Sequence, residues 1–429
     1  MASFLLKNKY NISNERLKQL SFTFITQLVV LIMSFITIQL SAKYLGVDGF
    51  GEYNVARKVI STLTFPLLLG LGIAIPKYIA SASGDFYRSF YLIFSALVIL
   101  FFTLAVFIMI SYFNIAFFSL TFWGNIKYQY LVKPTIWAVV GLSSHTLLSA
   151  YFRGLLKLNI VNTLQIVNIG VLPLAALFWC KSSTWKLLEF LGISWCLTSI
   201  PLLLIITISG LFNIKFSKKE FYQTAKQVLV FGIIRLPGEI ALFAYFSLPL
   251  FFITQFYGVR QAGFFSLGLS FFQLCASFFE FSGVFLLPHI SKLYEQKEYL
   301  KIKKNVGIAL ILTSISCLVL VVFIEVIMEY LIEHYFGKEF IASISSNRIL
   351  LLGALPYTFY MVLRNPLDAI SFFPYNSLNL VTALLIQIVI LWCSVYLFPD
   401  LYYLSIVFSS FFLAIITFIS WSKEIKKNV

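Results

Sequence analysis

Long apolar segments follow one another along almost the whole chain, and the short gaps between them hold most of its charged residues. From Leu17 to Trp421 the sequence repeatedly offers windows of about 20 residues with almost no charge, which matches the thickness of a bilayer's hydrocarbon core. Backbone groups in lipid must be hydrogen-bonded internally, so each window predicts a transmembrane helix. A β-barrel would instead show alternating segments of about ten residues. We expect an all-α polytopic membrane protein.

The pattern predicts twelve transmembrane helices. Hydrophobic residues make up 60% of the chain and charged residues only 11%, far from the balance of soluble domains. The first apolar segment is too long for the core of a cleavable signal peptide, so we expect it to remain as the first helix. The predicted ranges are 19–42, 53–80, 89–112, 129–152, 160–180, 186–210, 227–254, 261–288, 306–328, 347–364, 376–398 and 401–421.

Lysine and arginine gather in alternate gaps. Of the 32 basic residues, 21 lie at the termini or in the even-numbered gaps, ten lie on the opposite side, and Arg235 lies within a span. Because positively charged loops stay in the cytoplasm, both termini are predicted to be cytoplasmic. The net charge of +15 follows largely from these loops. We therefore expect no nucleic-acid partner.

The two halves of the chain resemble each other at an offset of 212 residues. Six predicted helices separate the copies, so both halves enter the membrane from the same side. Such repeats are typical of transporters, and this one predicts two six-helix lobes related by a pseudo-two-fold axis along the membrane normal. The lobes would comprise residues 1–212 and 213–429, with the substrate path between them. The matches are Gly46 with Gly258, Val47 with Val259, Gly51 with Gly263, Tyr53 with Phe265, Pro76 with Pro288 and, at an offset of 211, Arg153 with Arg364.

Charged residues at membrane depth are costly, so each suggests a function. On the predicted second helix, Arg57 lies about one turn inside the outer boundary, with Lys58 beside it. One interpretation is a cationic lumen that attracts an anionic group such as a diphosphate, which arginine binds through two parallel hydrogen bonds. The alternative is that Arg57 extends to the outer headgroups.

The seventh and eighth predicted helices also carry charge. Arg235 and Glu239 are four residues apart and can pair on one face, beside a Pro237-Gly238 step that suggests a bend. Either the pair is structural, or Arg235 contacts substrate and Glu239 modulates that contact. Glu280 ends a polar stripe on the eighth helix whose serines suit close helix packing. Packing does not require a carboxylate, so Glu280 is a candidate for substrate contact.

Three further basic or titratable residues lie on the fourth and tenth predicted helices. His145 shares a face with Ser149 and Arg153. A histidine can relay protons near neutral pH, although a packed, hydrogen-bonded histidine is the structural alternative. Arg153 and Arg364 end their helices at the predicted cytoplasmic surface. We expect them to anchor those helices, and their repetition also suggests a gate that contacts phosphate where substrate enters.

Several function classes find no support in the sequence. It contains no nucleotide-binding glycine loop, no HExxH and no convincing set of nucleophile, histidine and acid. The five cysteines show no metal-binding spacing. We therefore expect no enzyme activity, no metal and no cofactor, and coupling to a proton or sodium ion stays open.

Two short stretches resemble the Wzx-type polysaccharide (O-antigen) flippases of the multidrug/oligosaccharidyl-lipid/polysaccharide (MOP) exporter superfamily. Residues 43–53 (KYLGVDGFGEY) are similar to the outer turn after the first helix of these flippases, and residues 70–80 (GLGIAIPKYIA) to the end of their second helix. A weaker copy follows from Gly258 to Phe265, and the end of the tenth helix, Met361 to Asn365, is also similar. The superfamily also contains drug–cation antiporters and the lipid II flippase.

The resemblance implies a function. Such a protein would move undecaprenyl-diphosphate-linked oligosaccharides across the bacterial inner membrane by alternating access, for O-antigen or capsule biosynthesis. Its partners would be the lipid-linked substrate, membrane lipids, a polysaccharide polymerase and a chain-length regulator. The family's cationic lumen maps onto Arg57, with Lys58 and Arg235 as further members. One departure is that Leu269 stands opposite Arg57 in the second half, so the charge is not repeated.

Two alternatives remain. A cation-coupled multidrug exporter of the same superfamily would need membrane carboxylates, and only Glu239, Glu280 and Glu325 lie at depth. A membrane polysaccharide polymerase or ligase would carry a large outer loop. The longest outer gap, residues 329–346, is too short for that role.

Overall fold

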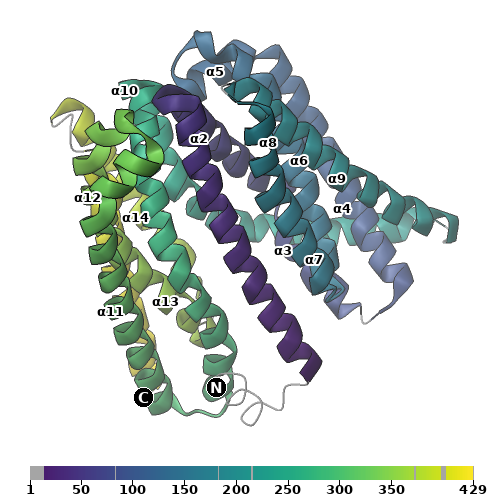
Figure 1. Cartoon of the computed structure of the whole chain (residues 1–429). Helices are drawn as coiled ribbons and strands as arrows, with labels where there is room; N and C mark the ends of the chain where they lie inside the picture. Colours follow the sequence, from purple (N-terminus) through teal and green to yellow (C-terminus); the bar gives the residue numbers. More distant parts are fainter. Residues whose placement is uncertain are drawn as a thin grey trace. The chain divides into compact units, whose positions relative to one another are not determined.

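The computed structural model describes residues 14–82, 84–181, 183–213, 216–371, 373–397 and 402–428, and every element within these ranges is helical (Figure 1). In the first half the elements are α2 (Asn14–Leu68), α3 (Leu71–Ser81), α4 (Phe86–Phe113), α5 (Ile115–Trp123), the 3₁₀ turn η1 (Ile126–Tyr128), α6 (Gln129–Gly154), α7 (Leu158–Gln165), the π-helical turn η2 (Ile166–Val171), α8 (Leu172–Trp179) and α9 (Thr184–Asn213). In the second half they are α10 (Lys218–Glu295), α11 (Tyr299–Leu331), the π-helical turn η3 (Ile332–Phe336), the 3₁₀ turn η4 (Lys338–Ser343), α12 (Ile344–Leu352), α13 (Ala354–Ile370), α14 (Tyr375–Tyr396) and α15 (Leu404–Asn428). The all-α prediction is confirmed.

The helices are long and apolar enough to cross a membrane. Eight helical stretches among the described residues meet this requirement, and two of them, Ser21–Leu68 and Lys218–Ala276, are each long enough for two crossings. With α6 and α13, which lie where the fourth and tenth spans are predicted, about twelve crossings result. Large apolar side chains such as Phe101, Phe102 and Val326 are 65%, 64% and 75% exposed. In water such patches would favour aggregation, whereas lipid tails solvate them.

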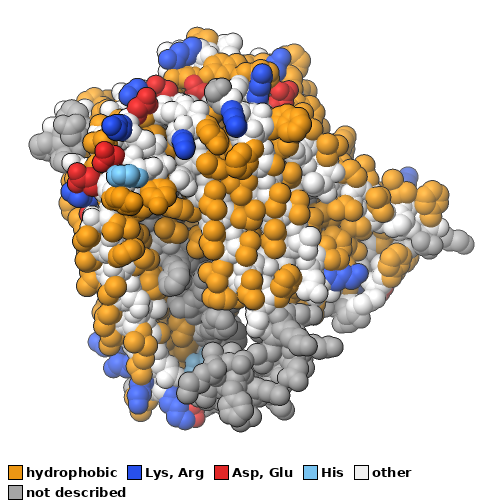
Figure 2. Space-filling view, viewed as in Figure 1, with side chains coloured by type: hydrophobic (Ala, Val, Ile, Leu, Met, Phe, Trp, Pro, Cys, Tyr) orange, Lys and Arg blue, Asp and Glu red, His pale blue; other side chains and the backbone are white. Residues whose placement is uncertain are grey.

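Charge distribution agrees with this placement. Figure 2 shows hydrophobic side chains covering the middle of the helices in view, while most charged side chains gather near helix ends. The chain is therefore a multi-pass membrane protein.

The helices form two compact units, each of which is described by itself. Unit 1 contains the chain up to Tyr44, then Val59–Ser119 and Lys127–Leu236. Unit 2 contains Leu45–Lys58, Leu120–Ile126 and Pro237 onward. The lobes predicted at 1–212 and 213–429 stay a prediction, since these units are made from interleaved segments.

Unit 1 is held together by close helix contacts at small residues. A Cβ atom at Gly141 on α6 would lie 2.6 Å from Cβ of Trp195 on α9, and one at Gly192 would lie 2.8 Å from the backbone nitrogen of Ala138. Helices pack this tightly in lipid through van der Waals contact, because lipid tails are as apolar as leucine. The α6–α9 pair thereby forms a rigid backbone for the polar groups described below.

In unit 2 the sequence repeat reappears as backbone geometry. Within α2, Gly46 has φ 65° and ψ −175°, and within α10, Gly258 has φ 84° and ψ 171°. Both positive φ values favour glycine. The predicted helices left gaps of residues 43–52 and 255–260 here. Instead, helical backbone resumes directly after each glycine, because one residue in this conformation is enough to bend the chain.

The segments that follow these two glycines pack against each other within unit 2. A Cβ atom at Gly51 would lie 2.1 Å from the carbonyl oxygen of Val259, and one at Gly263 would lie 3.3 Å from the backbone nitrogen of Gly51. Asp48 and Arg260, which are 212 residues apart, form an ion pair at 3.3 Å. Only glycine allows the two backbones to approach so closely.

The helices differ from the prediction at the second span. The predicted second span is broken at Leu69 and Gly70, which have φ values of 46° and 76°, so that α3 begins as a separate helix. Backbone contact with Gly232 on α10, where a Cβ at Gly70 would lie 2.4 Å from its carbonyl oxygen, accompanies this break. At Pro237-Gly238 the backbone angles stay helical, since non-helical angles within α10 occur only at Gly258, and the bend suggested there stays a prediction.

We predict that Gly51→Ala lowers the apparent Tm by several degrees, because overpacking of this kind typically costs about 1–3 kcal/mol. The measurement is thermal unfolding of the detergent-solubilised protein followed by circular dichroism. Gly307→Ala is the control: no atom lies within 4 Å of its new Cβ, and alanine favours the helix by about 1 kcal/mol. Equal Tm values for the two variants would show that the glycine contact is dispensable.

Candidate functional site

Arg57 and Lys58 lie on the part of α2 that belongs to unit 2. Both side chains are half-buried. The guanidinium carbon of Arg57 lies 5.6 Å from the centre of the Tyr53 ring, one turn earlier, and Tyr53 itself is buried. The ammonium of Lys58 lies 5.7 Å from the centre of the Phe246 ring on α10. Arg57 forms no ion pair with any described residue, so aromatic π-faces, not carboxylates, stabilise it.

An aromatic cluster backs Lys58. The Phe246 ring contacts the ring of Tyr357 at 5.2 Å and that of Phe272 at 5.8 Å, and Tyr245 stacks on Tyr357 at 5.8 Å. The cluster fixes the position of Phe246. It therefore presents a preorganised ring face to the Lys58 ammonium.

The aromatic cluster is tied to α15 and α14 by hydrogen bonds. The hydroxyl of Tyr245 lies 2.9 Å from Oγ of Ser409 and 2.8 Å from Oγ of Ser410. The amide of the fully buried Gln387 donates to Ser409 at 3.4 Å, and its Oε1 accepts no hydrogen bond among the described residues. An unsatisfied buried acceptor is uncommon in proteins.

The α10 candidates are separated by the boundary between the units. Arg235 belongs to unit 1, is exposed, and places its guanidinium carbon 4.5 Å from the centre of the Phe231 ring on the same helix. Glu239 belongs to unit 2 and is half-buried. Glu280 lies in α10, but its side chain is outside the described residues. The predicted role of each stays a prediction.

His145 lies at the centre of a buried polar network in unit 1. Its Nδ1 is 2.9 Å from Nδ2 of Asn168 in the π-helical turn η2. Oδ1 of Asn168 accepts a hydrogen bond from the Thr198 hydroxyl at 2.8 Å, and its backbone carbonyl accepts one from Nε1 of Trp195 at 2.7 Å. The network thus joins α6, η2 and α9.

The arrangement favours one tautomer of the imidazole. Because Oδ1 of Asn168 accepts from Thr198, Nδ2 of the same amide donates to the His145 ring, whose Nδ1 must then be unprotonated. With this amide orientation the ring carries its hydrogen on Nε2. The packed histidine of the structural alternative and the proton relay are both compatible with it.

Arg153 and Arg364 do not occupy equivalent helix ends. Arg153 is exposed in the last turn of α6, whereas α13 continues past Arg364 to Ile370. The expectation that both end their helices is wrong for Arg364, because the six residues after it, including Pro366, are also helical. The carbonyl of Arg364 accepts a hydrogen bond at 2.8 Å from the Asn376 amide, which also donates to Asp368 at 2.6 Å.

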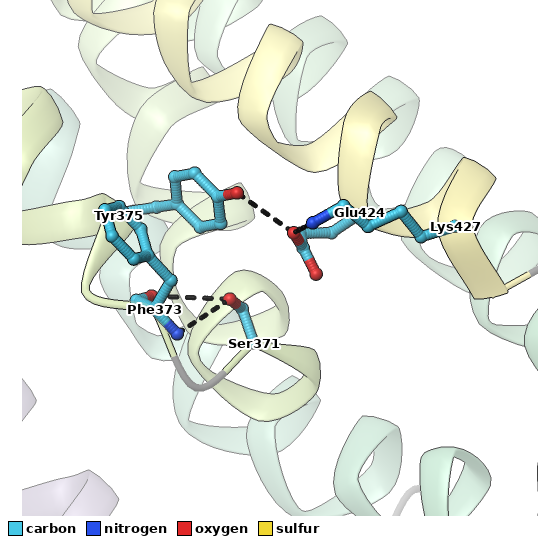
Figure 3. A network of polar contacts seen from close by, with 5 residues as sticks. All are labelled: Ser371, Phe373, Tyr375, Glu424 and Lys427. Carbon is cyan, nitrogen blue, oxygen red and sulfur yellow. Dashed lines mark hydrogen bonds and ion pairs between the residues drawn. The ribbon is translucent and has the colours of Figure 1, made fainter.

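A second polar network connects the ends of α13, α14 and α15 (Figure 3). The Tyr375 hydroxyl donates to Glu424 at 3.0 Å, and Lys427 donates to the same carboxylate oxygen at 2.7 Å. In the turn before α14, the Phe373 amide donates to Oγ of Ser371 at 3.1 Å. The lysine that this network holds is already neutralised by a carboxylate, so the network is structural.

Another membrane carboxylate is paired as well. Oε2 of Glu325 on α11 lies 3.5 Å from Nε of Arg348 on α12. A carboxylate held by an arginine is a poor receptor for a second cation. This removes one of the three groups at membrane depth that could serve a cationic substrate.

Sequence reasoning missed two groups of polar residues. Lys77 lies in the stretch 70–80, for which the sequence predicted no binding role, yet its ammonium lies 3.9 Å from the centre of the Phe231 ring. Asn168 and Thr198 received no role, although Asn162, Gln165 and Asn168 recur at a spacing of three within the fifth span. That spacing puts them near one helix face and could have drawn attention to them.

We predict that Asn168→Ala destabilises the protein, because it leaves His145 and Thr198 without their buried partner at a cost of about 1–3 kcal/mol per group. Chemical unfolding in detergent would measure this loss. The control is Asn159→Ala on α7, whose side chain is exposed and whose loss should leave stability within about 0.5 kcal/mol. Unchanged stability of Asn168→Ala would contradict the importance of the network.

Comparison with known proteins identifies the fold and the family. The structure is similar to an inward-facing multidrug resistance MATE family transporter of the MOP superfamily, at a TM-score of 0.77 with 14% identity over 95% of this chain and 98% of that one. It is also similar to a eukaryotic MATE transporter, at a TM-score of 0.65 with 13% identity, covering 96% of this chain and 97% of that one. A MOP superfamily transporter from Pyrococcus furiosus, described as having a binding pocket of reversed polarity, gives a TM-score of 0.58 with 13% identity, covering 96% and 95%.

These likenesses establish the fold, and a family model adds more. No curated protein sequence matches the chain. The model described as "Polysaccharide biosynthesis protein" matches residues 17–294, more than half of the chain. Family and fold together agree with the resemblance to polysaccharide flippases of the MOP superfamily seen in the sequence. The chain belongs to the polysaccharide biosynthesis protein family and is a multi-pass membrane protein whose fold is that of MOP superfamily transporters.

Proposed function

We propose that the protein is a flippase that moves undecaprenyl-diphosphate-linked oligosaccharide repeat units across the bacterial inner membrane. It does so by alternating access, with both termini in the cytoplasm, and its product serves O-antigen or capsule biosynthesis. A polysaccharide polymerase and a chain-length regulator would receive that product. Membership of the polysaccharide biosynthesis protein family supports a glycan cargo.

The observation that carries this proposal is a set of cations that lie within helices and rest on aromatic rings. Arg57 lies over Tyr53, Lys58 over Phe246 and Arg235 over Phe231. Arg57 and Arg235 form no ion pair with any described residue. A cation without a counter-charge at membrane depth is unfavourable unless something compensates it. An anionic cargo such as a diphosphate is that compensation.

Each candidate receives a role under this proposal. Arg57 binds a phosphoryl group through two parallel hydrogen bonds, and Lys58 adds a point charge beside it. Arg153 and Arg364 contact phosphate where substrate enters from the cytoplasm. Glu280 contacts the sugar hydroxyls, for which a carboxylate is a strong acceptor.

Transport against a gradient would need a coupling ion, for which a proton or sodium ion is the candidate. We assign the coupling to His145 and Glu239. Since Nδ1 of His145 accepts from Asn168, Nε2 would be the nitrogen that exchanges its hydrogen with solvent during the cycle.

We predict that Arg57→Ala abolishes complementation of a strain lacking the gene, while Arg57→Lys keeps part of the activity. The readouts are surface polysaccharide and the lipid-linked repeat unit accumulating on the cytoplasmic face. Lys186→Ala is the matched control, because Lys186 is exposed and rests on the ring of its neighbour Trp185 at 5.6 Å. Normal surface polysaccharide in the deletion strain would refute the flippase, and full activity of Arg57→Ala would leave Arg57 as a headgroup anchor.

The second candidate function is a cation-coupled multidrug exporter, which the MATE-like fold favours. The pairing of Glu325 with Arg348 argues against it. We predict that overexpression leaves susceptibility to cationic drugs such as ethidium within about twofold of the vector control, because Arg57 and Arg235, which form no ion pair with any described residue, are cations that repel such drugs. A large rise in resistance that Glu239→Gln removes would favour the exporter instead.

A further inference from the structure

We propose that Lys77 and Arg235 bind the diphosphate of the lipid-linked cargo on the side where substrate enters. The two residues lie on different helices of unit 1, and together with the Phe231 ring between those helices they form what we call the clamp. This inference rests on the proposed function. It adds Lys77 to the cations named above and pairs it with Arg235 in one site. Its residues are Lys77 on α3 and Phe231 and Arg235 on α10.

The two cations converge on one aromatic ring. The ammonium nitrogen of Lys77 lies 3.9 Å from the centre of the Phe231 ring, and the guanidinium carbon of Arg235 lies 4.5 Å from the same point. The two charges are therefore no farther apart than the sum of these distances. The edge of Tyr78 closes one side of the ring, at 5.5 Å between centroids and an interplanar angle of 71°.

No carboxylate neutralises this pair of cations. Neither Lys77 nor Arg235 forms an ion pair or a side-chain hydrogen bond with any described residue, and their contacts are with aromatic rings. Both side chains are exposed, so an incoming ligand can reach them. Two like charges at this separation repel each other, and the ring quadrupole offsets only part of that repulsion. An anion that contacts both cations offsets it.

The backbone of unit 1 holds the clamp in place. Where α3 begins, Leu69 and Gly70 meet α10 at Gly232, so close that a Cβ at Gly232 would lie 2.1 Å from the carbonyl oxygen of Leu69. Phe231 precedes that contact point by one residue, and Arg235 follows it by less than one turn. Lys77 lies two helical turns along α3. The crossing of the two helices therefore brings these side chains together, and their geometry exists before any ligand binds.

The chemistry of the pair selects the ligand. Arginine presents a planar fork that matches two oxygens of one phosphoryl group, and lysine supplies a compact charge for a second group nearby. A diphosphate offers two adjacent phosphoryl groups and satisfies both cations at once, whereas a monophosphate satisfies one. The lysine and arginine pattern predicts that Lys77 lies at the cytoplasmic end of its helix. Substrate that enters from the cytoplasm would meet the clamp there.

The test is binding of farnesyl diphosphate to the purified full-length chain in phosphatidylcholine nanodiscs, measured by calorimetry. Farnesyl monophosphate is measured alongside. We expect the wild type to bind the diphosphate about tenfold more tightly than the monophosphate, and Lys77→Gln and Arg235→Gln each to remove about that factor. Lys77→Arg, which keeps the charge, should retain most of the affinity.

The matched control is Lys157→Gln. Lys157 is exposed, lies on the same predicted side of unit 1, and contacts no ring or carboxylate among the described residues. Its loss should leave the affinity unchanged. Circular dichroism melts verify that each variant is folded, which is expected because both clamp residues are exposed.

Two results would overturn the clamp. One is equal diphosphate affinity in the wild type and in both glutamine variants, or no binding by the wild type. The other is a wild type that binds the diphosphate no more tightly than the monophosphate and loses affinity for both when phosphatidylglycerol is added to the nanodiscs. That result would identify a lipid-headgroup site. The flippase function is tested separately by complementation. Failure of the clamp would leave that function standing, and failure of the flippase proposal would not change the binding result.

Discussion

Contact of backbone with backbone at glycine is the constraint on which each unit of this protein depends. Helices in lipid gain little from burying apolar side chains, because the tails around them are equally apolar. They associate where small residues let them approach. Gly51 against Val259 in unit 2, and Gly232 against Leu69 and Gly141 against Trp195 in unit 1, are such places. Arg57, Lys58, Lys77, His145 and Arg235 lie within two turns of these contacts and take their positions from them.

The sequence predicted the elements well and their neighbours poorly. Hydropathy predicted where the helices run, and the repeat predicted that Gly46 and Gly258 are equivalent, which their backbone angles confirm. Helical spacing predicted which residues share a face, such as His145 with Arg153. Helical spacing contains no information on which other helix meets that face, so the hydrogen bond between Asn168 and His145 could not be foreseen.

The same limit applies to the break in the second span. Leu69 adopts a positive φ, which leucine does not favour by itself, and the contact that accompanies it lies on α10 far along the chain. Arg235 was expected to pair with Glu239 because they are near in sequence. Its observed contact is also local, but with the ring of Phe231, since a guanidinium stacks on an aromatic face as readily as it pairs with a carboxylate. Such a contact lowers the cost of the charge and still leaves its hydrogen-bond donors available to a ligand.

The ion pair between Asp48 and Arg260 distinguishes this chain from a symmetric dimer. The two residues occupy equivalent positions in the two halves, as their separation of 212 residues shows. If two identical subunits met at this point, each residue would face its own copy, and two aspartates or two arginines would repel. Opposite charges at equivalent positions require two halves that differ in sequence, as the two halves of this chain do. Joining the halves in a single chain thus gives this junction an attraction that no homodimer of either half could have.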